Sequence, residues 1–148
     1  MDIPIDVRLP ICIEQGVVVN FSFLGQDPKA EMPKNRYFVV VNANPKTDSV
    51  IILVTSTTQV AKKIEYIKRT GLNAETVVTV TPAEFAVFSK ETAFNCNDVY
   101  EYSLDELVKK VEESGSMNYP KLPTSITNKI IAGIKASPKV RNEVKKLM

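Results

Sequence analysis

The chain has 148 residues, of which 44% are hydrophobic and 24% charged, and this size and composition are typical of one globular domain. It contains no histidine, which excludes Ser-His and Cys-His catalysis, histidine acid–base chemistry and most zinc sites. The longest apolar run, residues 50–54, is far shorter than the ~20 residues of a membrane span. Charged residues near the start predict no secretory signal, and two isolated cysteines, Cys12 and Cys96, predict a cytoplasmic location.

The net charge of +2 is unevenly distributed along the chain. Residues 1–120 sum to −4, whereas residues 121–148 hold seven basic residues and one acidic residue and sum to +6. A basic tail of this kind can follow phosphates or contact an acidic partner, and an ordinary solvated helix face explains it equally well.

The first half of the chain predicts three strands, in residues 16–24, 36–42 and 50–55, because these stretches are rich in β-branched and aromatic residues. A long charged loop, 25–35, separates the first two, and loops of this length are often functional. Residues 57–69 suit a short helix or a covered ribbon equally. Two further strands are expected in residues 75–81 and 94–102.

The second half predicts helices. Ser103 and Glu106 form a capping box that begins a helix ending near Gly115. A second helix follows with Thr124 or Thr127 as its cap, and Ser137-Pro138 is expected to open a third. Strands followed by helices favour a small antiparallel barrel or an α+β domain. We expect residues 1–120 to form the barrel with one helix, and residues 121–148 a basic helical extension packed on it.

One pair of positions suggests chemistry. Arg36 begins the second strand and Thr55-Ser56 ends the third. Antiparallel neighbours would bring this guanidinium and these hydroxyls to the same rim of the sheet. Arginine stabilises the charge of a phosphorane-like transition state and threonine binds a phosphate oxygen, so the pair suits RNA cleavage without histidine. A solvated arginine and an ordinary strand end fit the same pattern.

The order of these segments resembles the PemK/MazF family of toxins from toxin–antitoxin modules. The resemblance covers residues 14–113 and rests on the Gly16-led strand, the Lys34-Asn35-Arg36 entry, the Val54-Thr55-Ser56 exit and the late strand that runs into a Ser-Leu-Asp-Glu-Leu helix. It implies a small SH3-like antiparallel β-barrel of the PemK/MazF/CcdB type with C-terminal helices. Tyr37 follows Arg36 where the family has proline, and residues from Lys121 onward match no family segment.

The resemblance implies a metal-independent endoribonuclease that cleaves single-stranded RNA by attack of the 2′-hydroxyl on its own phosphate. The family's catalytic arginine falls on Arg36 and its threonine on Thr55, with Ser56 as the accompanying hydroxyl residue. It also implies a homodimer without cofactor, held inactive by a cognate antitoxin.

Other residues are candidates for RNA contact. Lys34, Lys62 and Lys63 can follow phosphates, and Asn95 and Asn97 can contact base edges, although solvated faces and polar alternation on an exposed strand explain them as well. Tyrosines 37, 66, 100 and 102 can stack on bases, but Tyr100 and Tyr102 share a strand face and favour packing. Two alternatives stay open: a catalytically inactive barrel that binds RNA or protein, and an interaction protein that works through its C-terminal helices.

Overall fold

A computed structural model describes residues 3–23, 34–114 and 119–148. Its elements, in chain order, are α1 (Ile5–Cys12), β1 (Val18–Phe23), β2 (Lys34–Val40), β3 (Ile51–Thr57), α2 (Val60–Arg69), the 3-10 turn η1 (Ala74–Thr76), β4 (Val77–Val80), β5 (Thr92–Tyr102), α3 (Leu104–Ser114), α4 (Thr124–Ala136) and α5 (Asn142–Lys145). No helix in these ranges is long and apolar enough to cross a membrane.

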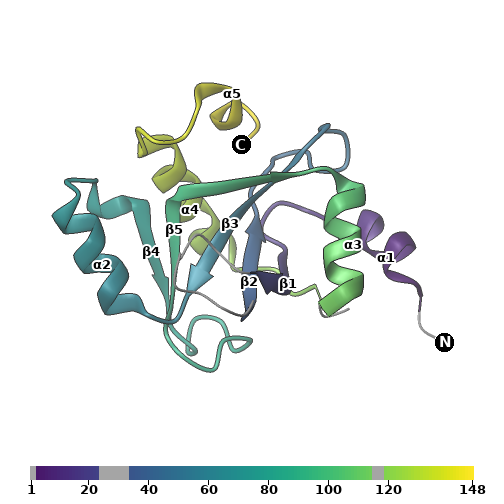
Figure 1. Cartoon of the computed structure of the whole chain (residues 1–148), viewed down its shortest axis with the longest axis horizontal. Coiled ribbons are helices and arrows are strands. Elements are labelled where there is room, and N and C mark those ends of the chain that lie inside the picture. Colours follow the sequence, from purple (N-terminus) through teal and green to yellow (C-terminus); the bar gives the residue numbers. More distant parts are fainter. Residues whose placement is uncertain (1–2, 24–33, 115–118) are drawn as a thin grey trace.

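The five strands form one antiparallel sheet in the order β1-β2-β3-β5-β4 (Figure 1). The predicted α+β class with an antiparallel sheet is therefore confirmed. In the described part of the chain β1 and β4 lie at the two edges, so the sheet is open where the expected barrel would be closed.

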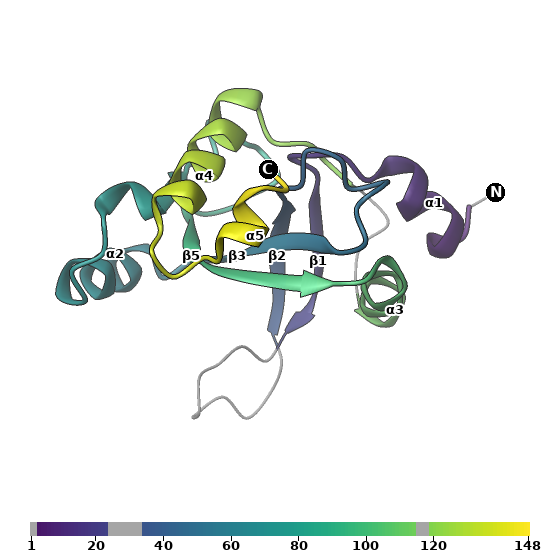
Figure 2. The ribbon, with the colours of Figure 1, turned by 90° about the horizontal axis from the view of Figure 1, so that it is seen from above.

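Alternating side chains divide the core into two clusters, one on each face of the sheet. Phe21, Phe38 and Leu53 point to one face, the α3 face, where side chains of α1 and α3 join them. Val39, Ile52 and Val54 point to the other face, the α4 face, together with side chains of α4 and α5. Figure 2 shows the two groups of helices on either side of β1 and β2.

The C-terminal residues are part of this core. Ile126, Ile130 and Ile134 of α4 are buried on the α4 face, and Val140 and Val144 join the same cluster. The apolar side of the basic tail is thus occupied by the sheet, and its charged residues remain outside.

The capping box at the start of α3 forms as predicted. The Glu106 amide donates to the Ser103 hydroxyl and the Ser103 amide donates to the Glu106 carboxylate, both at 3.1 Å. Leu107 and Val111 are buried against the α3 face. The predicted end of this helix at Gly115 lies outside the described residues.

Ser103→Ala is expected to lower the free energy of unfolding by about 1 kcal/mol, because it removes the acceptor of a first-turn amide. Chemical denaturation measures the change. Thr124→Ala is the control, because the cap of α4 is Pro123 and no side chain caps that helix. A loss of equal size in both variants would contradict the assignment.

Three local predictions were resolved or corrected by the structure. Residues 57–69 contain a helix, α2, and not a ribbon. Neither Thr124 nor Thr127 is the cap of α4, because Pro123 occupies that position with extended backbone. Ser137-Pro138 opens no helix: α5 begins only at Asn142, although the Ser137 hydroxyl accepts the Lys139 amide hydrogen at 3.2 Å and donates to the Asn97 side chain in the core. The short helix α1 was not expected at all.

Candidate functional site

Arg36 and Thr55 lie on neighbouring strands and on the same face of the sheet. Thr55 pairs with Phe38 in the β2–β3 register, and Arg36 is two residues before Phe38, so both side chains belong to the α3 face. The Arg36 guanidinium reaches β3, where Nη1 donates to the carbonyl oxygen of Ser56 at 3.2 Å. The structure therefore brings together the two strand ends that the sequence pattern singled out.

Two atoms of this pair lack a hydrogen-bond partner. Among the described residues, Arg36 Nε and Thr55 Oγ1 are buried and accept or donate no hydrogen bond. Buried polar atoms are nearly always paired, and an unpaired one costs about 1–3 kcal/mol. An oxygen-rich anion would satisfy both groups, since a phosphate oxygen accepts from a guanidinium and from a hydroxyl.

A cavity of about 180 Å³ opens beside Arg36 at this end of β2 and β3. It is lined by the ends of both strands, the start of α2 and the segment before β5: Asn35, Arg36, Tyr37, Ser56, Thr57, Thr58, Gln59, Phe88, Ser89, Lys90 and Thr92. Thr55 itself is not part of the lining. Ser56 is buried, and its hydroxyl donates to the Tyr37 carbonyl at 2.8 Å, so it joins β2 to β3 at the site.

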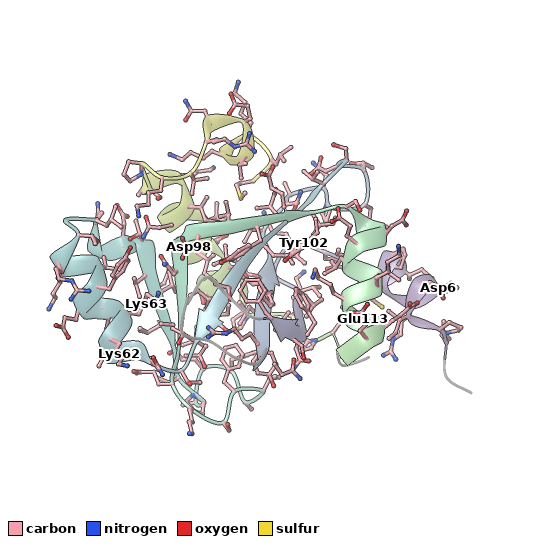
Figure 3. All side chains as sticks on the ribbon, in the orientation of Figure 1. Asp6, Lys62, Lys63, Asp98, Tyr102 and Glu113 are labelled. Carbon is pink, nitrogen blue, oxygen red and sulfur yellow. The ribbon has the colours of Figure 1, made fainter. Side chains whose placement is uncertain are left out.

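The predicted phosphate-contacting lysines fall in two places. Lys62 is exposed and Lys63 half-buried on α2, which begins just after the cavity residue Gln59. Figure 3 shows both lysines on α2, and Lys63 Nζ lies 5.4 Å from the centre of the Tyr66 ring. Lys34 is the first residue of β2, two positions before Arg36.

Asn95 and Asn97 lie in the interior, not on an exposed strand. Their exposed fractions are 3% and 6%. Asn97 Nδ2 donates to Thr76 at 2.8 Å and to the Asn95 side chain at 3.0 Å. We therefore leave both residues out of the RNA-contacting surface proposed below. Alternating polar residues in a sequence are typical both of an exposed strand and of a strand beside a buried polar network. The sequence therefore contained no signal that distinguished these two environments.

Tyr100 lies on the same face of the sheet as Arg36, and its ring packs against other aromatic rings, as the sequence pattern predicted. Its ring contacts those of Phe23 and Phe38 edge-on, with centres 5.0 and 6.3 Å apart. Burial raises the pKa of Tyr100 to about 12, and the Asp98 carboxylate acts in the same direction, while the charge of Arg36 acts against it. Neither Tyr100 nor Asp98 was assigned to the site from the sequence.

The described residues contain no cluster of three or more His, Cys, Asp or Glu side chains that could hold a metal ion.

A comparison with solved structures found the same fold elsewhere. An endoribonuclease from a mycobacterial species, solved in complex with its cognate antitoxin, aligns with a TM-score of 0.51 and 14% identity over 83% of this chain and 91% of that chain. A MazE–MazF complex from Deinococcus radiodurans aligns with a TM-score of 0.49 and 12% identity over 82% and 92% of the two chains. No family model and no curated protein matches the sequence. The first alignment shows the fold, and the PemK/MazF-like architecture expected from the sequence is thus confirmed.

Proposed function

We propose that this protein is the endoribonuclease toxin of a toxin–antitoxin system and that it cleaves single-stranded RNA without a metal ion. The observation that carries the proposal is that Arg36 and Thr55 lie on one face of the sheet, on neighbouring strands. Each has a buried polar atom that lacks a hydrogen-bond partner among the described residues. The fold shared with an antitoxin-bound endoribonuclease supports it.

In the proposed reaction the RNA 2′-hydroxyl attacks the adjacent phosphorus and the bond to the 5′-oxygen breaks. Arg36 stabilises the negative charge that develops on the phosphoryl oxygens, because a guanidinium offers fixed parallel donors to such an anion. Thr55 holds a phosphate oxygen, and Ser56 keeps the two strand ends together through its bond to Tyr37. The products are a 2′,3′-cyclic phosphate and a 5′-hydroxyl.

The RNA strand runs from this site past the start of α2 in our proposal. Lys62 is exposed there, Lys63 is half-buried and Lys90 lines the cavity together with Arg36, so successive phosphates meet positive charge along this path. Lys34 is the first residue of β2, the strand that carries Arg36, and contacts the RNA at this end of the path. The toxin acts as a cytoplasmic homodimer and is inhibited by an antitoxin that covers the same surface.

The purified protein is expected to cleave a long single-stranded RNA in the presence of EDTA and to leave fragments with 2′,3′-cyclic phosphate ends. Gel analysis with and without phosphatase and acid treatment identifies the ends. Unchanged RNA, together with salt-sensitive binding in a filter assay, would overturn the enzyme and leave a catalytically inactive RNA-binding domain of the same fold.

A further inference from the structure

Strand β5 changes register with β3 at Thr55. Leu53 pairs with Tyr100 and Val54 with Val99, whereas beyond Thr55 the next pair is Ser56 with Phe94. Residues 95–98 of β5 therefore lie opposite one residue of β3. A bulge of this kind redirects side chains, and bulges are over-represented next to active sites. Asp98 directly precedes Val99, which is the partner of Val54, so it is the first bulge residue after the last regular pair before Thr55.

A buried hydrogen-bond network holds Asp98. Asn95 Nδ2 donates to Asp98 Oδ2 at 3.1 Å, and the Asn95 oxygen accepts the Asn97 amide hydrogen at 3.1 Å. Asn97 in turn donates to Thr76 of η1 and accepts from Ser137 after α4. Asn95 and Asn97 are buried, and Asp98 is half-buried at the open end of the network. A satisfied network of this kind fixes the carboxylate rigidly.

Tyr100, two residues after Asp98, pairs with Leu53 on the face that carries Arg36, and its ring centre lies 6.3 Å from that of Phe38. Its phenol is affected by the Asp98 carboxylate and by the Arg36 guanidinium, which come from β5 and β2. With a pKa near 12 the phenol keeps its proton at neutral pH and is a donor. The same strand, β5, thus carries an acceptor and a donor of protons two residues apart (Figure 3 labels Asp98).

Cleavage by the 2′-hydroxyl needs one group that takes a proton and one that gives a proton, and this chain has no histidine for either role. We propose, resting on the function proposed above, that Asp98 is the general base and Tyr100 the general acid. Asp98 removes the 2′-hydroxyl proton as the bond from that oxygen to phosphorus forms. The bond from phosphorus to the 5′-oxygen breaks, and Tyr100 gives its proton to this leaving oxygen.

The proton balance closes within the site. After cleavage Asp98 holds one proton and Tyr100 lacks one, so transfer between them through solvent restores both groups. Asn95 and Asn97 are positioning residues in this scheme, because they act only through Asp98.

Neighbouring residues of the same types provide matched controls. Glu101 is exposed and ion-paired with Arg141 at 2.7 Å, and it points away from the α3 face. Tyr102 shares the face of Tyr100 but contacts Phe21 and lies under Lys110, near Glu106. The groups that face Tyr100 are Asp98 and Tyr102 on its own strand and Arg36 on β2, and those from α3 act on Tyr102.

Two RNA substrates test the assignment: one with an ordinary scissile phosphodiester, and one with sulfur in place of the bridging 5′-oxygen, a leaving group that needs no proton. Tyr100→Phe is expected to lower kcat about 10²-fold on the ordinary linkage and less than about fivefold on the sulfur linkage. Asp98→Asn is expected to lower kcat about 10²-fold on both, since deprotonation of the nucleophile is common to them. Tyr102→Phe and Glu101→Gln are expected to stay within about twofold of the parent protein.

Equal losses of Tyr100→Phe on both linkages would overturn its role as acid, and an Asp98→Asn variant with parent activity would overturn the role of Asp98. If Arg36→Ala is inactive while both β5 variants are active, the acid–base pair fails and the proposed function stands. If the unmodified protein cleaves neither RNA, the proposed function itself fails.

A pH profile of the unmodified protein provides a measurement that does not depend on folding of the variants. The rate of cleavage of the ordinary linkage is expected to stay level from neutral pH to about pH 10, because the Tyr100 phenol keeps its proton until the pH approaches about 12. A fall in rate between about pH 8 and 10 on the ordinary linkage alone would overturn the assignment of Tyr100.

Discussion

Arg36→Ala is expected to lower kcat/KM for RNA cleavage by about 10²–10³-fold, the usual cost of removing one donor that stabilises a developing oxyanion. The Arg36 guanidinium reaches the end of β3, where it donates a hydrogen bond to the Ser56 carbonyl oxygen. Fluorescence from a quenched RNA oligonucleotide measures the rate. Arg36→Lys is expected to recover only part of the loss, because an ammonium lacks the fork of parallel donors.

The stability of this variant is a second readout of the same site. Removing a buried, unpaired Nε relieves a desolvation cost, so Arg36→Ala is expected to keep or raise the melting temperature. Arg141→Ala is the matched control. It breaks an exposed ion pair with Glu101, and cleavage is expected to stay within about twofold of the parent. Parent-like cleavage by Arg36→Ala would remove Arg36 from the catalytic site.

Gly133→Ala is expected to lower the free energy of unfolding by about 2 kcal/mol, although alanine is the better helix former by about 1 kcal/mol. Gly133 lies inside α4 where that helix meets η1 and β5. A Cβ atom there would lie 2.6 Å from the Glu75 carbonyl oxygen and 2.9 Å from Cys96 Sγ. Backbone on one side prevents an inexpensive adjustment, so overpacking outweighs helix propensity. Urea denaturation with unchanged slope measures the difference.

Asn128→Ala, at an exposed position of the same helix, isolates the propensity contribution and is expected to raise stability by a few tenths of a kcal/mol. A stabilised Gly133→Ala variant would mean that α4 packs on β5 less closely than the structure shows. Because Cys96 belongs to the strand that carries Asp98, we also expect Gly133→Ala to lower cleavage.

Local rules predicted the parts of this protein that depend on neighbours in the chain. The capping box of Ser103 and Glu106 is formed by residues three positions apart, and it lies where the pattern placed it. The strands containing Arg36 and Thr55 were recognised from their β-branched residues, and a short connection between antiparallel strands brings the end of one beside the start of the next. That is why a pair of residues 19 positions apart could be singled out from sequence.

The β5 bulge could not be predicted in this way. Asn95 and Asn97 looked like polar positions of an exposed strand, but Thr76 and Ser137 complete their hydrogen bonds from far along the chain. Ser137 likewise reaches Asn97 from 40 positions further along the chain, a contact that local rules for helix starts do not include.

The amino-acid sequence by itself determined the order of the five strands, the start of α3 and the placement of a guanidinium and a hydroxyl on adjacent strands, because periodicity, capping and turn chemistry act over a few residues. Only the tertiary structure decided that β5 changes register opposite Thr55 and that buried asparagines orient Asp98. Those features depend on hydrogen bonds between segments whose meeting is settled by packing of the whole core.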